Sequence, residues 1–255
     1  MNRRLIINAD DLGASLGVNR GIARAHERGV VTSASLMVRG PAAEPAAAYA
    51  RAHPRLAVGL HLDLEEWSPH GEGEWRAKYQ VVDSSDATAV AEEVVRQLRA
   101  FHALLGRGPT HLDGHQHVQR SEPVRSVLAG HGADLGVPVR LLSPSVTYCG
   151  GFYGQAGHGE PYPEGIRLRS LLDLLRGLPE GVTELGCHPG YPHDLDSDYR
   201  FERLTELEVL CDERVLETIA TERIELIAFD QIDGRGGPSR SDLVPPAPAG
   251  GTTAG

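Results

Sequence analysis

Residues 5–13 read Leu5-Ile6-Ile7-Asn8-Ala9-Asp10-Asp11-Leu12-Gly13, a short apolar run that ends in two adjacent carboxylates. Successive residues of a strand point to opposite faces, so two consecutive acids at the end of a buried strand can reach one cavity in two different roles. One can hold a cation while the other moves a proton. A single Asp in this place would as often cap the following helix, but two in succession favour the chemical interpretation.

The rest of the chain repeats the alternation of strand and helix that begins here. Apolar runs predict further strands at residues 33–37, 57–62, 110–112, 139–142, 182–187 and 225–229. Apolar positions at helical spacing predict helices near residues 18–28, 41–52, 90–105, 123–129, 171–175, 204–211 and 215–219. Two stretches lack a period: residues 65–85, which hold both tryptophans and are interpreted as an insertion, and the long loop 143–165.

Strands that alternate with helices predict a parallel sheet with crossover helices. Seven such units in one chain favour an α/β barrel over an open sheet. A length of 255 residues fits one domain, which we expect over residues 1–232. Residues 233–255 are rich in Pro, Gly and Ala and are predicted to be a disordered tail.

Composition excludes several classes of partner. The net charge of -10 argues against nucleic-acid and anionic-membrane binding, because both need a basic surface. No apolar stretch approaches the ~18 residues that cross a bilayer, and the segment after Met1 runs into a strand rather than into a signal-type apolar segment. We therefore expect a cytoplasmic protein whose partner is a small or neutral molecule. A barrel of this size stands alone or forms a homodimer through its outer helices.

Histidines rather than cysteines are the candidate metal ligands. The three cysteines lie far apart without a C-x-x-C pair, which predicts neither a disulfide framework nor a thiolate zinc site. Twelve histidines are present, and His111, His115 and His117 fall within seven residues.

Polar residues follow four of the predicted strands. They are Asp10 with Asp11, His61, the cluster at 113–117, and His188. In a parallel barrel the chemistry lies at the C-terminal ends of the strands. Four strand ends would therefore face one cavity, although an isolated histidine at a strand end is more often a hydrogen-bonded structural residue.

Such a set of groups fits metal-assisted hydrolysis. A carboxylate with two or three imidazoles suits Zn²⁺, Mn²⁺, Fe²⁺, Co²⁺ or Ni²⁺, and fewer than four protein ligands leave a position for water or substrate. The ion would activate the water and polarise a carbonyl, a second carboxylate would take the proton, and a histidine would protonate the leaving group. Two alternatives stay open: a metal-dependent phosphoesterase on a related barrel, and a catalytically silent carbohydrate-binding or regulatory protein.

Four motifs, in order along the chain, resemble those of the YdjC-like carbohydrate deacetylases, the group of the chitooligosaccharide and hopanoid-associated deacetylases. The motifs are Asn8-Ala9-Asp10-Asp11-Leu12-Gly13, Gly59-Leu60-His61-Leu62, Thr110-His111-Leu112-Asp113-Gly114-His115-Gln116-His117-Val118 and Glu184-Leu185-Gly186-Cys187-His188-Pro189-Gly190-Tyr191. The resemblance runs from Leu5 to about Phe229 and so covers nearly the whole chain.

The resemblance implies a distorted TIM-like (β/α) barrel related to polysaccharide deacetylases. The implied reaction removes the N-acetyl group of an amino sugar, with one divalent metal ion, magnesium or zinc, to give acetate and a free amine. By position, Asp11, His61 and His115 match the family's metal ligands. Asp10 matches the carboxylate proposed as general base, and His188 matches the histidine that we assign as general acid.

Further residues are candidates for substrate contact or support. His117 lies two residues beyond the ligand His115 and is expected to touch substrate, and Asp113 is placed to orient a ligating imidazole. Tyr148 and Tyr153, in the loop 145–154, are expected to stack on a sugar face. The alternative for all four is structural: they satisfy a strand end or pack the loop.

Overall fold

The computed structural model describes residues 2–70, 74–157 and 159–232. The predicted tail, 233–255, lies outside the described residues, so its disorder and the domain boundary at 232 stay predictions. None of the helices within the described part of the chain is both long and apolar enough to span a bilayer.

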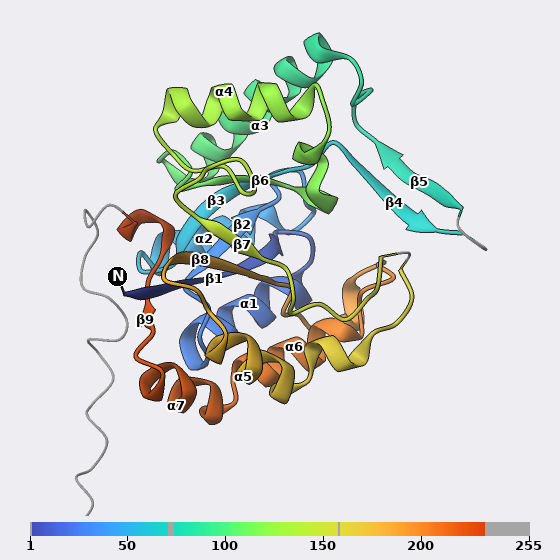
Figure 1. Cartoon of the computed structure of the whole chain (residues 1–255). Coiled ribbons are helices and arrows are strands. Elements are labelled where there is room, and N and C mark those ends of the chain that lie inside the picture. The colour runs from blue at the N-terminus through green and yellow to red at the C-terminus, as the bar shows by residue number, and fades with distance from the viewer. Residues whose placement is uncertain (1, 71–73, 158, 233–255) are drawn as a thin grey trace, which may run out of the picture.

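The core of the fold is a curved parallel sheet. Its strands in chain order are β1 (Arg3–Leu12), β2 (Ser33–Leu36), β3 (Ala57–Leu62), β6 (Leu112–Gly114), β7 (Thr147–Cys149), β8 (Gly181–Cys187) and β9 (Glu225–Leu226). Their spatial order is β6-β3-β2-β1-β8-β7, and β9 pairs with β1. All these pairs are parallel. The sheet curls into a half-barrel with β6 and β7 at its edges (Figure 1), which confirms the predicted distorted α/β barrel.

Helices connect the strands and cover the outside of the sheet (Figure 1). They are α1 (Leu16–Arg28), α2 (Ala43–Ala52), α3 (Ala87–Leu105), α4 (Val124–Leu135), α5 (Leu168–Arg176), α6 (Glu202–Leu210) and α7 (Glu213–Thr221). Local sequence sets their ends: the Ser15 hydroxyl accepts a hydrogen bond from the Val18 amide at the start of α1, and Gly106, with φ 69°, ends α3.

Burial explains the apolar run in the middle of β1. It pairs with β2, β8 and β9, and helices cover the outer face of the sheet. Leu5, Ile6 and Ile7 are fully buried in consequence. A parallel strand covered on both faces has a continuous apolar run instead of an alternating one. The carboxylates of Asp10 and Asp11 follow this run, near the C-terminal end of β1 at the mouth of the half-barrel.

Besides shifted strand ends at β6 and β9, three segments differ from the sequence prediction. Residues 65–85 contain an antiparallel hairpin of β4 (Glu65–Pro69) and β5 (Trp75–Gln80). The sequence of β5 alternates apolar and polar residues, but β4, with two glutamates followed by Trp67, Ser68 and Pro69, has no such pattern, and the pairing shifts register between Glu66 and Trp67. The strand predicted at 139–142 is only an isolated bridge at Val139, because a turn follows in which Leu142 and Ser143 both donate to the Val139 carbonyl. The predicted loop 143–165 contains β7.

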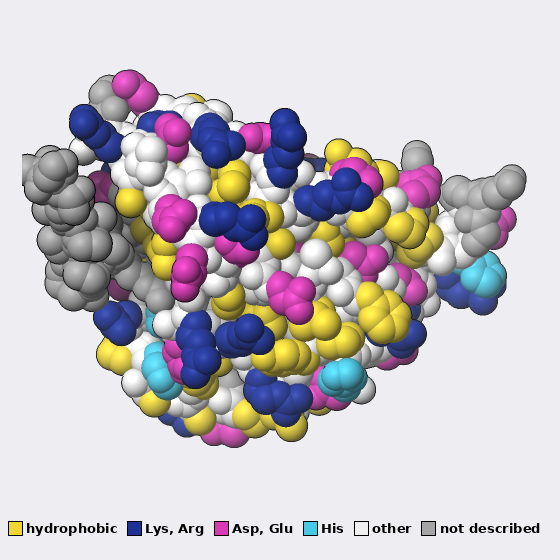
Figure 2. Space-filling model, turned by 90° about the horizontal axis from the view of Figure 1, so that it is seen from below, with side chains coloured by type: hydrophobic (Ala, Val, Ile, Leu, Met, Phe, Trp, Pro, Cys, Tyr) yellow, Lys and Arg dark blue, Asp and Glu magenta, His cyan; other side chains and the backbone are white. Residues whose placement is uncertain are grey.

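The surface carries charges of both signs. On the face shown in Figure 2, Lys and Arg side chains lie interspersed with Asp and Glu and do not gather into one basic patch. This face therefore lacks the concentrated basic surface that nucleic acids and anionic membranes attract.

Candidate active site

The C-terminal end of β1 brings two neighbouring carboxylates into one cavity. Asp10 and Asp11 are each 3% exposed. The chain leaves the strand through left-handed backbone, with φ 65° at Asp11 and 97° at Gly13. Such a conformation is uncommon for a residue other than glycine and is concentrated at functional sites. The turn directs the two side chains to different partners.

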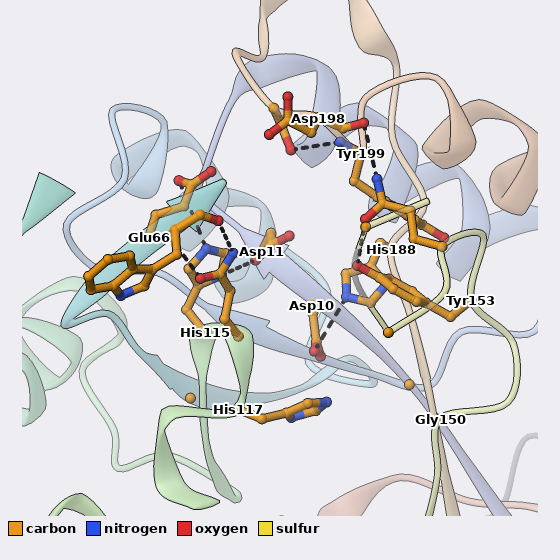
Figure 3. A pocket seen from close by; sticks show the side chains of 18 of the residues that line it. Asp10, Asp11, Glu66, His115, His117, Gly150, Tyr153, His188, Asp198 and Tyr199 are labelled. Carbon is orange, nitrogen blue, oxygen red and sulfur yellow. Dashed lines mark hydrogen bonds and ion pairs between the residues drawn. The ribbon is translucent and has the colours of Figure 1, made fainter. Parts of the chain in front are cut away.

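Asp11 is the centre of a three-residue group that could hold a metal ion. Its Oδ1 atom lies 3.2 Å from Nε2 of His61 and 3.1 Å from Nδ1 of His115. One atom from each of the three residues lies within 4.8 Å of the others. His61 comes from β3 and His115 from the turn after β6, so three strand ends supply the group. Figure 3 shows Asp11 and His115 directed toward each other.

Buried partners orient the group. Nδ1 of His61 lies 2.7 Å from Oδ1 of Asp113, which follows from the register that places these residues opposite each other on β3 and β6. Burial would lower the pKa of His61, but the carboxylates of Asp113 and Asp11 outweigh it and raise the pKa well above its usual range. On the other side, Arg203 donates to Oδ2 of Asp11 at 2.6 Å. Burial disfavours the ionised form of Asp11 and would raise its pKa, but Arg203 and the two imidazoles outweigh burial and hold the pKa well below its usual value.

Asp10 is held by a buried arginine. Arg140 donates to both oxygens of Asp10, at 2.6 and 2.7 Å. The same guanidinium contacts Asp113 at 2.9 Å and Glu184 at 2.6 Å. Burial alone would raise the pKa of Asp10, but Arg140 outweighs it and lowers the pKa. Asp10 is therefore an ionised carboxylate of fixed orientation beside the metal-ligand group.

A second group of ligand atoms lies deeper, formed by Asp10, His61 and Asp113. Nη2 of Arg140 donates to Asp10 at 2.7 Å and lies 2.9 Å from Asp113. A fixed positive charge thus already joins the two carboxylates, and a cation placed there would be repelled at short range. The group that includes Asp11 and His115 is the better candidate metal centre.

His188 follows β8 and faces Asp10 across the cavity (Figure 3). Its Nε2 atom lies 3.8 Å from Oδ2 of Asp10, and its backbone N–H donates to the buried Glu206. Burial lowers the pKa of His188 to about 4. Burial also raises the pKa of Glu206 to about 8, against the opposing hydrogen bonds from His188 and Tyr199. Both groups are therefore neutral at pH 7.

The cavity above these groups has a volume of about 550 Å³. All eight site residues predicted from the sequence line it: Asp10, Asp11, His61, His115, His117, Tyr148, Tyr153 and His188. The Tyr148 hydroxyl lies 3.4 Å from Nε2 of His117, and the Tyr153 ring stacks on Tyr199 at 4.5 Å. Aromatic rings with polar edges thus form one wall of the cavity.

His111 has a different place from its neighbours in the motif. It is fully buried and lies behind the cavity wall, with Nε2 3.0 Å from the Ser35 hydroxyl and its ring stacked on Phe229 at 3.8 Å. Burial lowers its pKa to about 4, so the ring is neutral. These contacts match the structural interpretation of a histidine at a strand end.

Sequence reasoning missed several charged residues of the site, among them Arg140, Arg203 and Glu206. Each carried a weak signal. Arg140 is a single cation in the apolar run 137–142. Arg203 and Glu206 lie three residues apart on α6, on the same helix face as buried Leu207 and Leu210. A charge placed among core positions predicts a buried ion pair, but the sequence does not say with which partner.

Comparisons with known proteins relate the chain to a family and to a fold. The YdjC-like protein family matches residues 4–221. A chitooligosaccharide deacetylase of Salmonella paratyphi B is 34% identical over 242 residues, which cover 86% of this chain and 95% of that protein. Among solved structures, a candidate cellobiose-phosphate cleavage protein from Enterococcus faecalis V583 is 27% identical with a TM-score of 0.73, covering 90% of this chain and 98% of the other.

A more distant structure shows the same fold. The family 4 carbohydrate esterase from Streptomyces lividans, solved in complex with acetate, is 13% identical with a TM-score of 0.51 and covers 91% of this chain and 96% of the other. The half-barrel is therefore shared beyond the sequence family. This chain belongs to the YdjC-like protein family, as shown by the family match over residues 4–221 of the chain and by the 34% identity to the Salmonella protein.

Proposed function

We propose that the protein is a metal-dependent carbohydrate N-deacetylase, which hydrolyses the N-acetyl group of an amino sugar to acetate and a free amine. One observation carries the proposal: Asp11, His61 and His115 converge at one cavity. Beside them lies a second carboxylate, that of Asp10, which Arg140 holds in a fixed orientation. The relatives named chitooligosaccharide deacetylase support the same reaction.

The chemistry of the three converging groups fits a divalent metal ion. The Asp113 carboxylate is hydrogen-bonded to Nδ1 of His61, so the other ring nitrogen, Nε2, faces Asp11 and is the atom that would bind a metal ion. Two imidazoles and one carboxylate favour a first-row ion such as zinc over magnesium, which prefers oxygen ligands. Such an ion, when bound, polarises the acetyl carbonyl and lowers the pKa of a water beside it.

Asp10 and His188 move the protons in this proposal. Asp10 is ionised at neutral pH and takes a proton from the attacking water as the new C–O bond forms. His188 is neutral at pH 7, so it acts as an acid only after it has received that proton from Asp10, 3.8 Å away. As the C–N bond breaks, His188 gives the proton to the departing amine.

The rest of the cavity holds the sugar. His117, Tyr148 and Tyr153 line it and are proposed to contact the substrate ring. A cytoplasmic location and a homodimer remain predictions from the sequence.

Acetate release from a panel of N-acetylated monosaccharides, oligosaccharides and glycolipids tests the function. The enzyme is first stripped with a chelator and then reloaded with zinc, manganese or magnesium in turn. We expect acetate only from reloaded protein, and loss of bound metal in His61→Ala and His115→Ala. Phosphate release from phosphate esters without acetate would favour the phosphoesterase, although Arg140 occupies the place where a second ion would bridge Asp10 and Asp113. Sugar binding without either product would identify a silent carbohydrate-binding protein.

A further inference from the structure

The two tryptophans of the chain lie on the same face of the β4–β5 hairpin. In the register of the hairpin Trp67 pairs with Ala77 and Pro69 pairs with Trp75, and side chains of directly paired residues point to the same side. Trp67 and Trp75 are therefore diagonal neighbours, with Cα atoms roughly 7–8 Å apart. Trp67, Pro69 and Trp75 all line the cavity of the candidate active site.

Both indoles of the hairpin remain partly exposed. Trp67 is 37% and Trp75 44% exposed, whereas Phe101 and Phe152 are fully buried. Figure 1 shows the hairpin extending beyond the sheet at the mouth of the half-barrel, so its aromatic face does not contribute to the main core. An exposed aromatic face that lines a cavity is typical of a ligand-binding surface.

This face begins next to the candidate metal centre. The bulge between Glu66 and Trp67 brings both of these neighbouring side chains to the cavity. Oε2 of Glu66 lies 3.9 Å from Nε2 of His115, and Figure 3 shows these two side chains together. A ring that stacks on Trp67 would therefore lie beside the ring whose acetyl group is at the metal centre, and Trp75 is farther along the same strand pair.

Gln116 fixes the hairpin relative to the metal ligands. Its Oε1 atom accepts a hydrogen bond from the Trp67 amide at 2.9 Å, and its Nε2 atom donates to the Trp67 carbonyl at 2.7 Å. Gln116 follows His115 directly and has left-handed backbone, with φ 49°. One side chain thus joins the turn that carries a metal ligand to the residue that begins the aromatic face.

We propose that Trp67 and Trp75 form a stacking platform for a second sugar ring, that Gln116 is its positioning residue, and that these three residues determine how strongly the enzyme favours N-acetylated carbohydrates of two or more rings over monosaccharides. This inference rests on the proposed deacetylase function and assigns that preference to residues outside the metal centre. Flat indole faces bury the apolar face of a sugar ring while the ring hydroxyls stay at its edge, in contact with water or polar groups.

Intrinsic tryptophan fluorescence tests binding directly, because the platform contains both tryptophans of the chain. N-Acetylglucosamine and its linear trimer are titrated into metal-loaded Asp10→Asn protein, so that neither sugar is consumed. We expect the trimer to change the emission and the monosaccharide to leave it nearly unchanged. In Trp67→Phe and in Trp75→Phe, the single remaining indole should still respond to the trimer.

Steady-state kinetics on the otherwise unchanged enzyme tests preference. We expect Trp67→Ala and Trp75→Ala to lower kcat/KM for the trimer about tenfold, mainly through KM, with the monosaccharide changed less than about twofold. Gln116→Ala should reproduce this split, and the Trp→Phe variants should keep most of the parent rate. Arg76→Ala is the matched control, because Arg76 lies between Trp75 and Ala77 and points to the other face of the hairpin.

Two results would overturn the platform: equal losses on monosaccharide and trimer in the Trp→Ala variants, or unchanged fluorescence at trimer concentrations that saturate turnover. Absence of acetate from every sugar, together with a fluorescence response specific to the trimer, would refute the deacetylase function while supporting the platform. Failure of the function and failure of the platform are therefore distinguishable.

Discussion

The Nδ1 atom of His61 lies 2.7 Å from Oδ1 of the buried Asp113, and this contact determines which nitrogen of the ring faces Asp11. A histidine that gives one ring nitrogen to a carboxylate is fixed in orientation and made more basic at the other. The proposed metal centre therefore depends on a residue that does not itself face Asp11.

Replacing this carboxylate tests its role. Asp113→Asn keeps the size of the side chain but removes its charge, and we expect metal affinity to fall about 10–100-fold. Competition with a chromophoric chelator measures the affinity, and circular dichroism checks that the variant is folded. Asp173→Asn, on the exposed side of α5, is the control. Unchanged affinity in a folded Asp113→Asn protein would contradict the orienting role.

Asp10 is expected to be needed for turnover but not for metal binding. Its two oxygens are held by Arg140, and it is the carboxylate next to His188. Asp10→Asn should keep bound metal while kcat falls about 10²–10⁴-fold, the usual contribution of a general base. Metal analysis and acetate release are measured on the same preparation, with Asp11→Asn expected to lose both. A parent-like rate in Asp10→Asn would refute the base assignment.

Arg140 should contribute strongly to stability. It is fully buried among Asp10, Asp113 and Glu184, and removing one partner of a buried ion pair leaves charge uncompensated. Arg140→Met is expected to lower the free energy of unfolding by about 3–5 kcal/mol in urea at pH 7. The exposed Arg176→Met should change it by less than about 0.5 kcal/mol.

A second substitution isolates the electrostatic part of that loss. Arg140→Met combined with Asp10→Asn has one buried carboxylate fewer and should recover part of the stability. A double variant that is no more stable than Arg140→Met alone would show that the loss came from packing.

The parallel sheet could be predicted from the sequence because burial on both faces gives its central strands, such as β1 and β3, apolar runs. The strand predicted at 57–62 is β3 within its observed bounds, and the half-barrel mouth could be located from Asp10, His61 and His188 at strand ends. Strand-end position is a local property, so it can be read without knowing which strands are neighbours.

The pairing of charges could not be predicted in the same way. Arg140 contacts residues from β1, β6 and β8, which lie between 27 and 130 positions away along the chain. Only the spatial order of the strands brings them together. The β4–β5 hairpin was missed for a local reason, since β4 is short and has no alternating pattern from which its pairing with β5 could be predicted.

Glu206 provides a test of the buried site that does not depend on metal. Its pKa is about 8 in the folded protein because of burial, against 4.5 for an ordinary Glu side chain. Between these pH values the folded state keeps a proton that the unfolded state has released. The unfolded state then binds fewer protons, so this group makes the protein less stable as pH rises from about 4.5 to 8, with no further change above 8.

Glu206→Gln removes that titration and resembles the protonated acid in shape and hydrogen bonding. Relative to the parent, we expect the variant to gain stability as pH rises, by about 2–5 kcal/mol between pH 5 and pH 9. Urea denaturation of metal-free protein at pH 5, 7 and 9 measures the difference, with the exposed Glu164→Gln as control. A stability difference that stays constant or shrinks with rising pH would mean that Glu206 is ionised in the fold, and the neutral pair it forms with His188 would have to be abandoned.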